Sequence, residues 1–177
     1  EALRDRLVTY FEVRNMTHKP KLVAITGCSH KAGVTSIATG LAAVLSETGD
    51  GNVLLVDMNQ NQAAAQAFRQ GQPQLSLAEA LEAPPRNEAG EQDKLSIVSG
   101  HGDNNRLPRI LPKRFSQLLP RMKASDYDYI IFDMPPVSQT SVTSRLASFM
   151  DTTLLVIEAE KDHLDAVRRA AQSLQES

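Results

Sequence analysis

The residues best suited to chemistry lie in one short stretch between an apolar run and a helical pattern. The run 22–26 leads into the segment Gly27-Cys28-Ser29-His30-Lys31-Ala32-Gly33-Val34-Thr35-Ser36. A strand, a glycine-bounded turn and a hydroxyl-bearing helix start direct backbone N–H groups and the helix dipole at an anion. The spacing therefore predicts a phosphate-binding loop, whose candidate ligand-binding residues are Gly27, Lys31, Gly33, Val34, Thr35 and Ser36.

One part of such a loop is missing. The usual loop ends in Gly-Lys-Ser/Thr, and its lysine ammonium reaches the terminal phosphates. Here Val34 follows Gly33, so the phosphate clamp is incomplete. Lys31 could reach inward in its place, although a lysine on such a loop is more often a solvated surface residue.

Two aspartates close predicted strands. Asp57 begins the run Asp57-Met58-Asn59, and Asp133 begins the run Asp133-Met134-Pro135-Pro136. Because parallel sheets bind ligands beyond the carboxyl ends of their strands, both carboxylates are placed to hold Mg²⁺ or its water shell. Asp57 and Asp133 are therefore candidate metal-binding residues. The alternative is that each aspartate only caps the following helix or turn.

The apolar patterns that must position these residues alternate between strand and helix. Continuous apolar runs, typical of strands buried on both faces, predict strands near 22–26, 53–57, 95–99, 129–133 and 152–157. Helices are predicted near 1–15, 35–47, 62–69, 113–123 and 138–147, with a last one from 162, and 83–93 is expected to be an exposed loop. This alternation implies an α/β fold, a doubly wound and mostly parallel sheet with helices on both faces.

The composition is that of a globular protein and disfavours several functional classes. The 177 residues are 41% hydrophobic and 23% charged. A net charge of −2 and a pI near 6.1 give no basic footprint for nucleic acid. No apolar run approaches the roughly 18 residues of a membrane helix, and the single cysteine, Cys28, excludes an internal disulfide framework.

Two further features are weaker candidates. Cys28 and His30 lie two apart, but the other histidines show no ligand spacing, so a small buried residue beside a polar loop residue is favoured over a metal site. A basic helix face is formed by Lys113, Arg114, Arg121 and Lys123. We interpret it as a solvated face, with contact to anionic lipid or a neighbouring subunit as the alternative.

Taken together, the segments 26–36, 53–59 and 127–136 resemble the Walker-type motifs of the bacterial tyrosine kinases (BY-kinases). BY-kinases are the cytoplasmic ATPase modules of polysaccharide co-polymerases, which control export and chain length of capsular and extracellular polysaccharides. The Asp-x-Pro-Pro strand end is shared with their relatives, the septum-site and partition ATPases. The resemblance implies a P-loop NTPase-like fold of the deviant-Walker group. It also implies one domain over 1–177, with a helix over 1–15 and a nucleotide-binding-type core over 21–177 that is cut short at its C-terminal end.

The departures from the family pattern bear on activity. Val34 stands where the family has its catalytic lysine, and Asn59 and Asn61 replace the second acid and the arginine of the second motif. The resemblance implies that Thr35, Asp57 and Asp133 form the Mg²⁺ site and that the two aspartates are a vestigial catalytic site. Losing one such preorganised contact costs about 3–4 kcal/mol, or roughly a hundred- to thousandfold in rate. We therefore expect weak or absent binding of ATP and Mg²⁺, and a degenerate domain that regulates or scaffolds exopolysaccharide or capsule biosynthesis and export. Two alternatives stay open: an active tyrosine autokinase in which Lys31 replaces the clamp, and a partition-type ATPase.

The resemblance extends to the first residues. Glu1-Ala2-Leu3-Arg4 resembles the start of the family's ExxRxxR oligomerisation helix, with Leu7 in place of its final arginine. A homo-oligomer formed through this helix is therefore expected to have a weaker or more apolar contact. The implied partner is a membrane-embedded co-polymerase segment, and the implied location is the cytoplasmic face of the bacterial inner membrane.

Overall fold

The described strands form one parallel sheet. The computed structural model describes residues 1–49, 51–59, 75–82, 94–99 and 112–176. Its strands are Lys21–Gly27 (β1), Val53–Asp57 (β2), Leu95–Ser99 (β3), Tyr129–Asp133 (β4) and Thr152–Val156 (β5). Their order is β3-β2-β4-β1-β5, and each ladder between them is parallel. The predicted strands and the parallel α/β architecture are confirmed.

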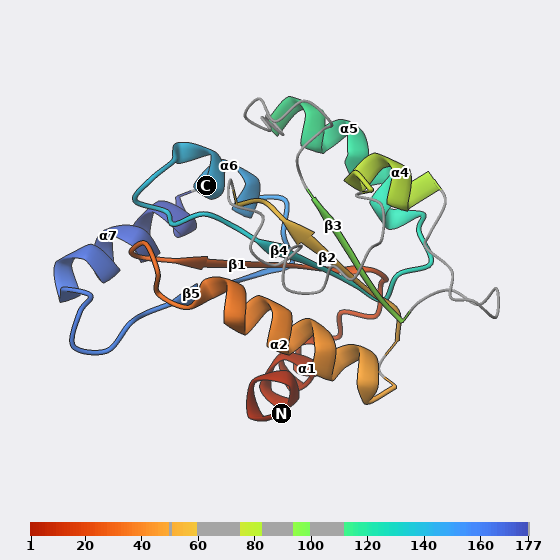
Figure 1. The fold of residues 1–177 in the computed structure, drawn as a ribbon, viewed down its shortest axis with the longest axis horizontal. Coiled ribbons are helices and arrows are strands. Elements are labelled where there is room, and N and C mark those ends of the chain that lie inside the picture. Colours follow the sequence, from red (N-terminus) through yellow and green to blue (C-terminus); the bar gives the residue numbers. More distant parts are fainter. Residues whose placement is uncertain (50, 60–74, 83–93, 100–111, 177) are drawn as a thin grey trace.

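Helices cover both faces of this sheet (Figure 1). They are Ala2–Val13 (α1), Val34–Glu47 (α2), Leu77–Glu82 (α4), Pro112–Lys123 (α5), Ser141–Ala147 (α6) and Leu164–Gln175 (α7). The helices α1 and α2 share an apolar cluster with one face, through residues such as Phe11 and Leu41. The helices α4, α5 and α6 share another cluster with the opposite face, through residues such as Phe115 and Leu146.

Two details differ from the sequence prediction. The helix predicted from 138 begins at Ser141, because Thr140 takes an extended backbone and its hydroxyl oxygen accepts the Val142 N–H at 3.1 Å as an N-cap. The short helix α4 was not predicted, since six residues are too few for a clear helical periodicity. The helix predicted at 62–69, the loop predicted at 83–93 and Asn61 lie outside the described residues.

Two aspartates accept hydrogen bonds from backbone N–H groups at the amino ends of the strands. Asp151 accepts the Leu22 N–H at 2.7 Å, and Asp128 accepts the Asn52 N–H at 2.7 Å and pairs with Lys19. Gly51 has φ 131°, and a Cβ there would lie 2.0 Å from a carboxylate oxygen of Asp128, so the turn requires glycine. These charged residues therefore serve the fold at the end of the sheet opposite the predicted loop.

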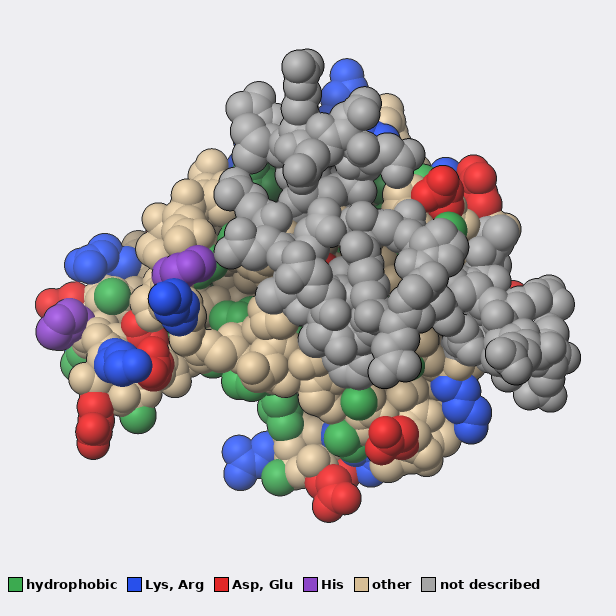
Figure 2. Space-filling view, in the orientation of Figure 1, with side chains coloured by type: hydrophobic (Ala, Val, Ile, Leu, Met, Phe, Trp, Pro, Cys, Tyr) green, Lys and Arg blue, Asp and Glu red, His purple; other side chains and the backbone are tan. Residues whose placement is uncertain are grey.

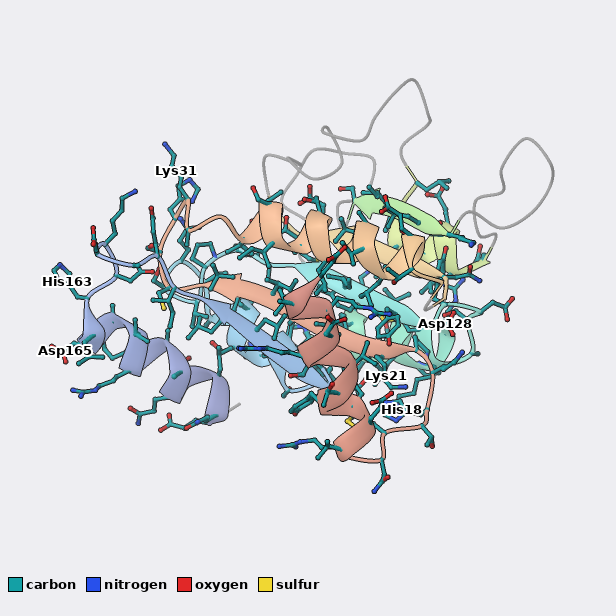
Figure 3. The ribbon with its side chains drawn as sticks, turned by 90° about the horizontal axis from the view of Figure 1, so that it is seen from below. His18, Lys21, Lys31, Asp128, His163 and Asp165 are labelled. Carbon is teal, nitrogen blue, oxygen red and sulfur yellow. The ribbon has the colours of Figure 1, made fainter. Side chains whose placement is uncertain are left out.

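Figure 3 shows this separation directly. His18, Lys21 and Asp128 lie at one end of the sheet, and Lys31, His163 and Asp165 lie at the other. Within the described residues, no helix combines the length and apolar character needed to span a membrane.

Candidate functional site

The loop between β1 and α2 has the backbone of an anion site. Gly33 precedes α2 with φ 83° and ψ 14°, a left-handed conformation that glycine adopts at little cost. Lys31 is also left-handed, with φ 67°. No side chain at the N-cap accepts a hydrogen bond from α2, and the first turn holds no acidic residue. The positive end of the helix dipole is therefore uncompensated by the helix's own first turn.

Val34 fills the position where a lysine would clamp phosphate. Its side chain is 9% exposed and belongs to the apolar cluster of α1 and α2. A Cβ placed on Gly27 would lie 3.0 Å from Val34 Cγ2 and 3.3 Å from the Ala32 Cβ. The valine thus packs against the end of β1 and the turn of the loop, and it brings no charge to the site.

The other loop residues lie on the rim. Lys31 and His30 are exposed, and in Figure 3 the Lys31 side chain extends away from the ribbon. His30 Nδ1 lies 3.2 Å from Gln139 Nε2, which connects the loop to the segment after β4. Ser36 is also exposed. Gly27 and Val34 are therefore buried and Thr35 is half-buried, whereas Lys31, Gly33 and Ser36 lie at the surface.

Cys28 shows the predicted arrangement of a buried small residue. It is 4% exposed, whereas its neighbour His30 is exposed. Burial raises the pKa of the Cys28 thiol, and Asp162 raises it further, so a thiolate is disfavoured. Among the described residues, no group of three or more histidine, cysteine, aspartate or glutamate side chains is placed to hold a metal ion.

Asp57 and Asp133 lie side by side at the carboxyl ends of neighbouring strands. The β2–β4 ladder pairs them directly, and both side chains are 0% exposed. Asp57 accepts the Asn59 N–H at 2.9 Å, so part of the turn-capping alternative applies to it. Asn59 also donates its amide to the Asp133 carbonyl oxygen at 3.3 Å. The structure therefore brings the two strand-closing acids together.

Asp133 is the electrostatic centre of this site. Neither of its carboxylate oxygens has a hydrogen-bond partner of normal geometry. Desolvation by burial, with Asp57 adding to it, raises the pKa of Asp133 to about 7, although the nearby Thr35 hydroxyl and Asn59 amide act in the opposite direction. A buried, unpartnered carboxylate beside a second acid and a hydroxyl fits a hard divalent cation such as Mg²⁺. Because only two carboxylates are present, phosphate and water oxygens would have to complete its coordination.

A network missed from the sequence holds the segment after Asp133 against the loop. The hydroxyls of Thr26 and Thr143 donate to the Pro135 carbonyl oxygen at 2.8 and 3.0 Å. The Val137 N–H donates to the Gly27 carbonyl oxygen at 3.0 Å. A hydroxyl at the end of a fully buried strand, as at Thr26, was the available signal. These bonds fix the loop relative to the acid pair.

The surface around the loop has no dominant charge. Figure 2 shows lysine, arginine and histidine side chains mixed with acidic ones at the end that carries the loop and the start of α7. On the predicted basic face, Arg121 is not simply solvated, because it pairs with Glu82 of α4, while Lys113, Arg114 and Lys123 are exposed.

The helix α1 corrects one expectation. Leu7 is 3% exposed and packs inside the chain with Phe11, so it cannot make a contact between copies more apolar. The more apolar contact is therefore wrong, because Leu7 belongs to the helix face turned toward α2, while a weaker contact between copies stays a prediction. Glu1 is exposed and Arg4 is half-buried, with its guanidinium 2.7 Å from Asp5.

Parallel strand order, the loop before α2 and acids ending two adjacent strands define a P-loop NTPase-like domain. Solved structures agree on this fold. The kinase domain of the Escherichia coli tyrosine kinase ETK matches 98% of this chain and 69% of its own, with TM-score 0.75 and 22% identity. The VpsO kinase domain matches 96% of this chain and 85% of its own, with TM-score 0.72 and 23% identity. McdA of Cyanothece, solved with ATP, matches 90% of this chain and 64% of its own, with TM-score 0.64 and 20% identity.

Sequence comparison narrows the class. No family model matches the chain. Two curated relatives, from Ralstonia nicotianae and Ralstonia solanacearum, are both named "Putative tyrosine-protein kinase EpsB" and are 27% identical over 180 residues and 26% identical over 181 residues. Each alignment covers 99% of this chain but 24% of the relative, so the chain spans about a quarter of the relatives' length. The chain is a BY-kinase-like domain.

Proposed function

We propose that this domain is a degenerate BY-kinase-like module that regulates or scaffolds exopolysaccharide or capsule biosynthesis and export, with impaired or absent ATP binding. Its place would be the cytoplasmic face of the bacterial inner membrane, next to a membrane-embedded co-polymerase segment. The polysaccharide assignment rests on the motif resemblance and on likeness to the two EpsB proteins.

The observation that supports this proposal most directly is that Val34 follows Gly33, where a phosphate-binding loop has lysine. Phosphoryl transfer depends on positive charge placed in advance beside the transferring group. At this position the chain has a methyl-bearing side chain that lies beside Gly27, in an apolar cluster shared with α1. The retained acids add negative charge to the same site, because Asp57 and Asp133 lie next to each other and are buried. The site therefore keeps the acidic residues that would hold Mg²⁺ and lacks the positive charge that would neutralise the γ-phosphate.

Each retained residue still has a task that its position supports. The backbone N–H groups around Gly33 and the start of α2 would face a phosphate. Thr35, Asp57 and Asp133 would hold Mg²⁺, which would supply positive charge to the phosphates. Asn59 cannot accept a proton at neutral pH, so it would orient Asp133 rather than act as a base.

An active autokinase is the competing function, and Lys31 is the residue on which it depends. Lys31 is exposed, and its side chain extends away from the ribbon in Figure 3. Serving as the clamp would require this side chain to turn back over the loop. A partition-type ATPase is the second alternative, and the fold likeness to McdA is compatible with it. The EpsB relatives favour the kinase-like assignment over it.

A phosphoryl-transfer assay separates these functions. The wild-type chain, Lys31→Ala and Val34→Lys are each incubated with Mg²⁺ and γ-labelled ATP, and hydrolysis and phosphotyrosine are measured. We expect background turnover in the wild type, no change in Lys31→Ala, and roughly a hundredfold gain in Val34→Lys. Substantial wild-type turnover that disappears in Lys31→Ala would establish the autokinase and end this proposal.

The scaffolding role has its own test in the source bacterium. Replacing the native copy by Asp57→Asn should leave polysaccharide output close to wild type, because the proposed role needs the fold and not the chemistry. Removing the segment equivalent to residues 1–177 should lower output. Equal loss in both strains, with normal protein levels, would show that the acid pair works chemically in the cell.

A proposed second task of this module is self-association through α1. Glu1 is exposed and Arg4 is partly exposed, so both side chains are able to meet a second copy. The buried Leu7 takes no part in this surface.

A further inference from the structure

Two parts of the site would hold a nucleotide. The phosphate-binding loop would bind the phosphates, and the pair Asp57 and Asp133 would bind Mg²⁺. In loops of this kind the backbone N–H groups surround the α- and β-phosphates, while the lysine reaches the β- and γ-phosphates. In this chain the backbone part is present, with Gly33 left-handed at the start of the 14-residue helix α2. The lysine part is replaced by Val34, which is buried among apolar side chains.

The absence of the lysine therefore weakens binding of the γ-phosphate more than binding of the β-phosphate. A β-phosphate would keep the loop amides and the positive end of α2. A γ-phosphate would lose its cation and would bring an additional negative charge toward Asp57 and Asp133, both 0% exposed. Charges that are close together in a water-poor site interact strongly, so this extra charge is penalised more than it would be in solvent.

An independent observation indicates that the site binds a ligand. Both carboxylate oxygens of Asp133 are buried and without hydrogen-bond partners, and the Thr35 hydroxyl of α2 lies close enough to act on that carboxyl. Buried polar atoms are normally satisfied, so an orphaned carboxylate beside the helix start points to a missing cation. Two carboxylates balance one divalent ion, which leaves no positive charge for a third phosphate group.

We propose that the site prefers a magnesium-bound nucleoside diphosphate to the corresponding triphosphate, the reverse of the order that the lysine would favour. This proposal rests on the proposed function, because it describes the binding that remains after the clamp is lost. Val34 is then the residue that determines whether the site prefers a diphosphate or a triphosphate. A diphosphate would occupy the loop without giving the acid pair a phosphate to transfer.

The test compares ADP and ATP by titration calorimetry, each with Mg²⁺, on the 177-residue chain and two variants of one position. Val34→Lys adds the charge, and Val34→Met adds a side chain of similar length without charge. We expect ADP to bind the wild type and Val34→Met about tenfold more tightly than ATP, and we expect Val34→Lys to reverse that order. Thermal unfolding checks that the variants are folded.

The outcomes separate this inference from the function on which it rests. ATP binding as tightly as ADP, or more tightly, to the wild type overturns the inference. The absence of binding by either nucleotide also overturns it, yet leaves the proposed loss of ATP binding intact. Should Val34→Lys fail to fold, the wild-type order of the two nucleotides still decides the matter, with inorganic pyrophosphate as a third ligand. Pyrophosphate is expected to compete with ADP, and failure to compete contradicts binding through the loop amides.

Discussion

Replacing Asp133 by asparagine should stabilise the domain, and more so as the pH rises. Burial raises the pKa of Asp133 from 3.8 to about 7. A carboxyl whose pKa rises on folding is protonated more easily in the folded state, so its cost is absent below pH 4 and grows as the pH climbs toward 7. At about 1.4 kcal/mol per pKa unit, the full cost is about 4 kcal/mol, of which roughly 3 kcal/mol develops between pH 5 and pH 8.

Urea unfolding at pH 5 and pH 8 measures this effect. Asp133→Asn keeps the shape of the side chain and removes its charge, so its free energy of unfolding should exceed that of the wild type by about 3 kcal/mol more at pH 8 than at pH 5. Asp165→Asn, which removes an exposed carboxylate on α7, serves as the control. Magnesium should raise the melting temperature of the wild type at pH 8 and leave that of Asp133→Asn unchanged. A stability difference that does not vary with pH would refute the assigned electrostatics of the acid pair.

Two further predictions concern the stability of the fold and self-association through α1. Gly51→Ala should lower the free energy of unfolding by roughly 2–4 kcal/mol, because its φ is 131° and its Cβ would meet Asp128, whereas Gly40→Ala in α2 meets nothing and should stabilise by up to about 1 kcal/mol. Chemical denaturation of both variants checks this, and equal stabilities would contradict the close approach at Gly51. Glu1→Ala with Arg4→Ala should reduce crosslinked oligomers of the membrane-tethered protein, while Glu12→Ala on the same helix should not. Unchanged oligomers in the double variant, with normal circular dichroism, would remove α1 from the interface.

Much of the fold could be predicted because the strands are continuous apolar runs. The strands β1 and β2 are buried along their whole length, and the uninterrupted apolar runs 22–25 and 53–56 within them make them easy to recognise. The aspartates 57 and 133 end such runs, which predicts that they lie at one edge of the sheet, and the ladder between β2 and β4 agrees. Short or capped elements were harder, since α4 has six residues and the start of α6 depends on the Thr140 hydroxyl.

The sequence allowed the candidate residues to be named, but it did not indicate their electrostatics. Residue types gave Thr35, Asp57 and Asp133, yet nothing in the sequence distinguishes the two acids. The difference comes from tertiary contacts: the Asn59 N–H reaches Asp57, while the oxygens of Asp133 stay without partners. The position of Leu7 shows the same limit. It packs with Phe11 in the core, while the motif resemblance assigned the same residue to a surface between copies.

The affinity of the wild-type chain for ATP tests the central claim most directly. Calorimetric titration with ATP in the presence of Mg²⁺ should give a dissociation constant well above a micromolar, or no measurable heat, because Val34 brings no charge to the terminal phosphates. A dissociation constant near or below about a micromolar, equivalent to roughly −8 kcal/mol, would contradict the account.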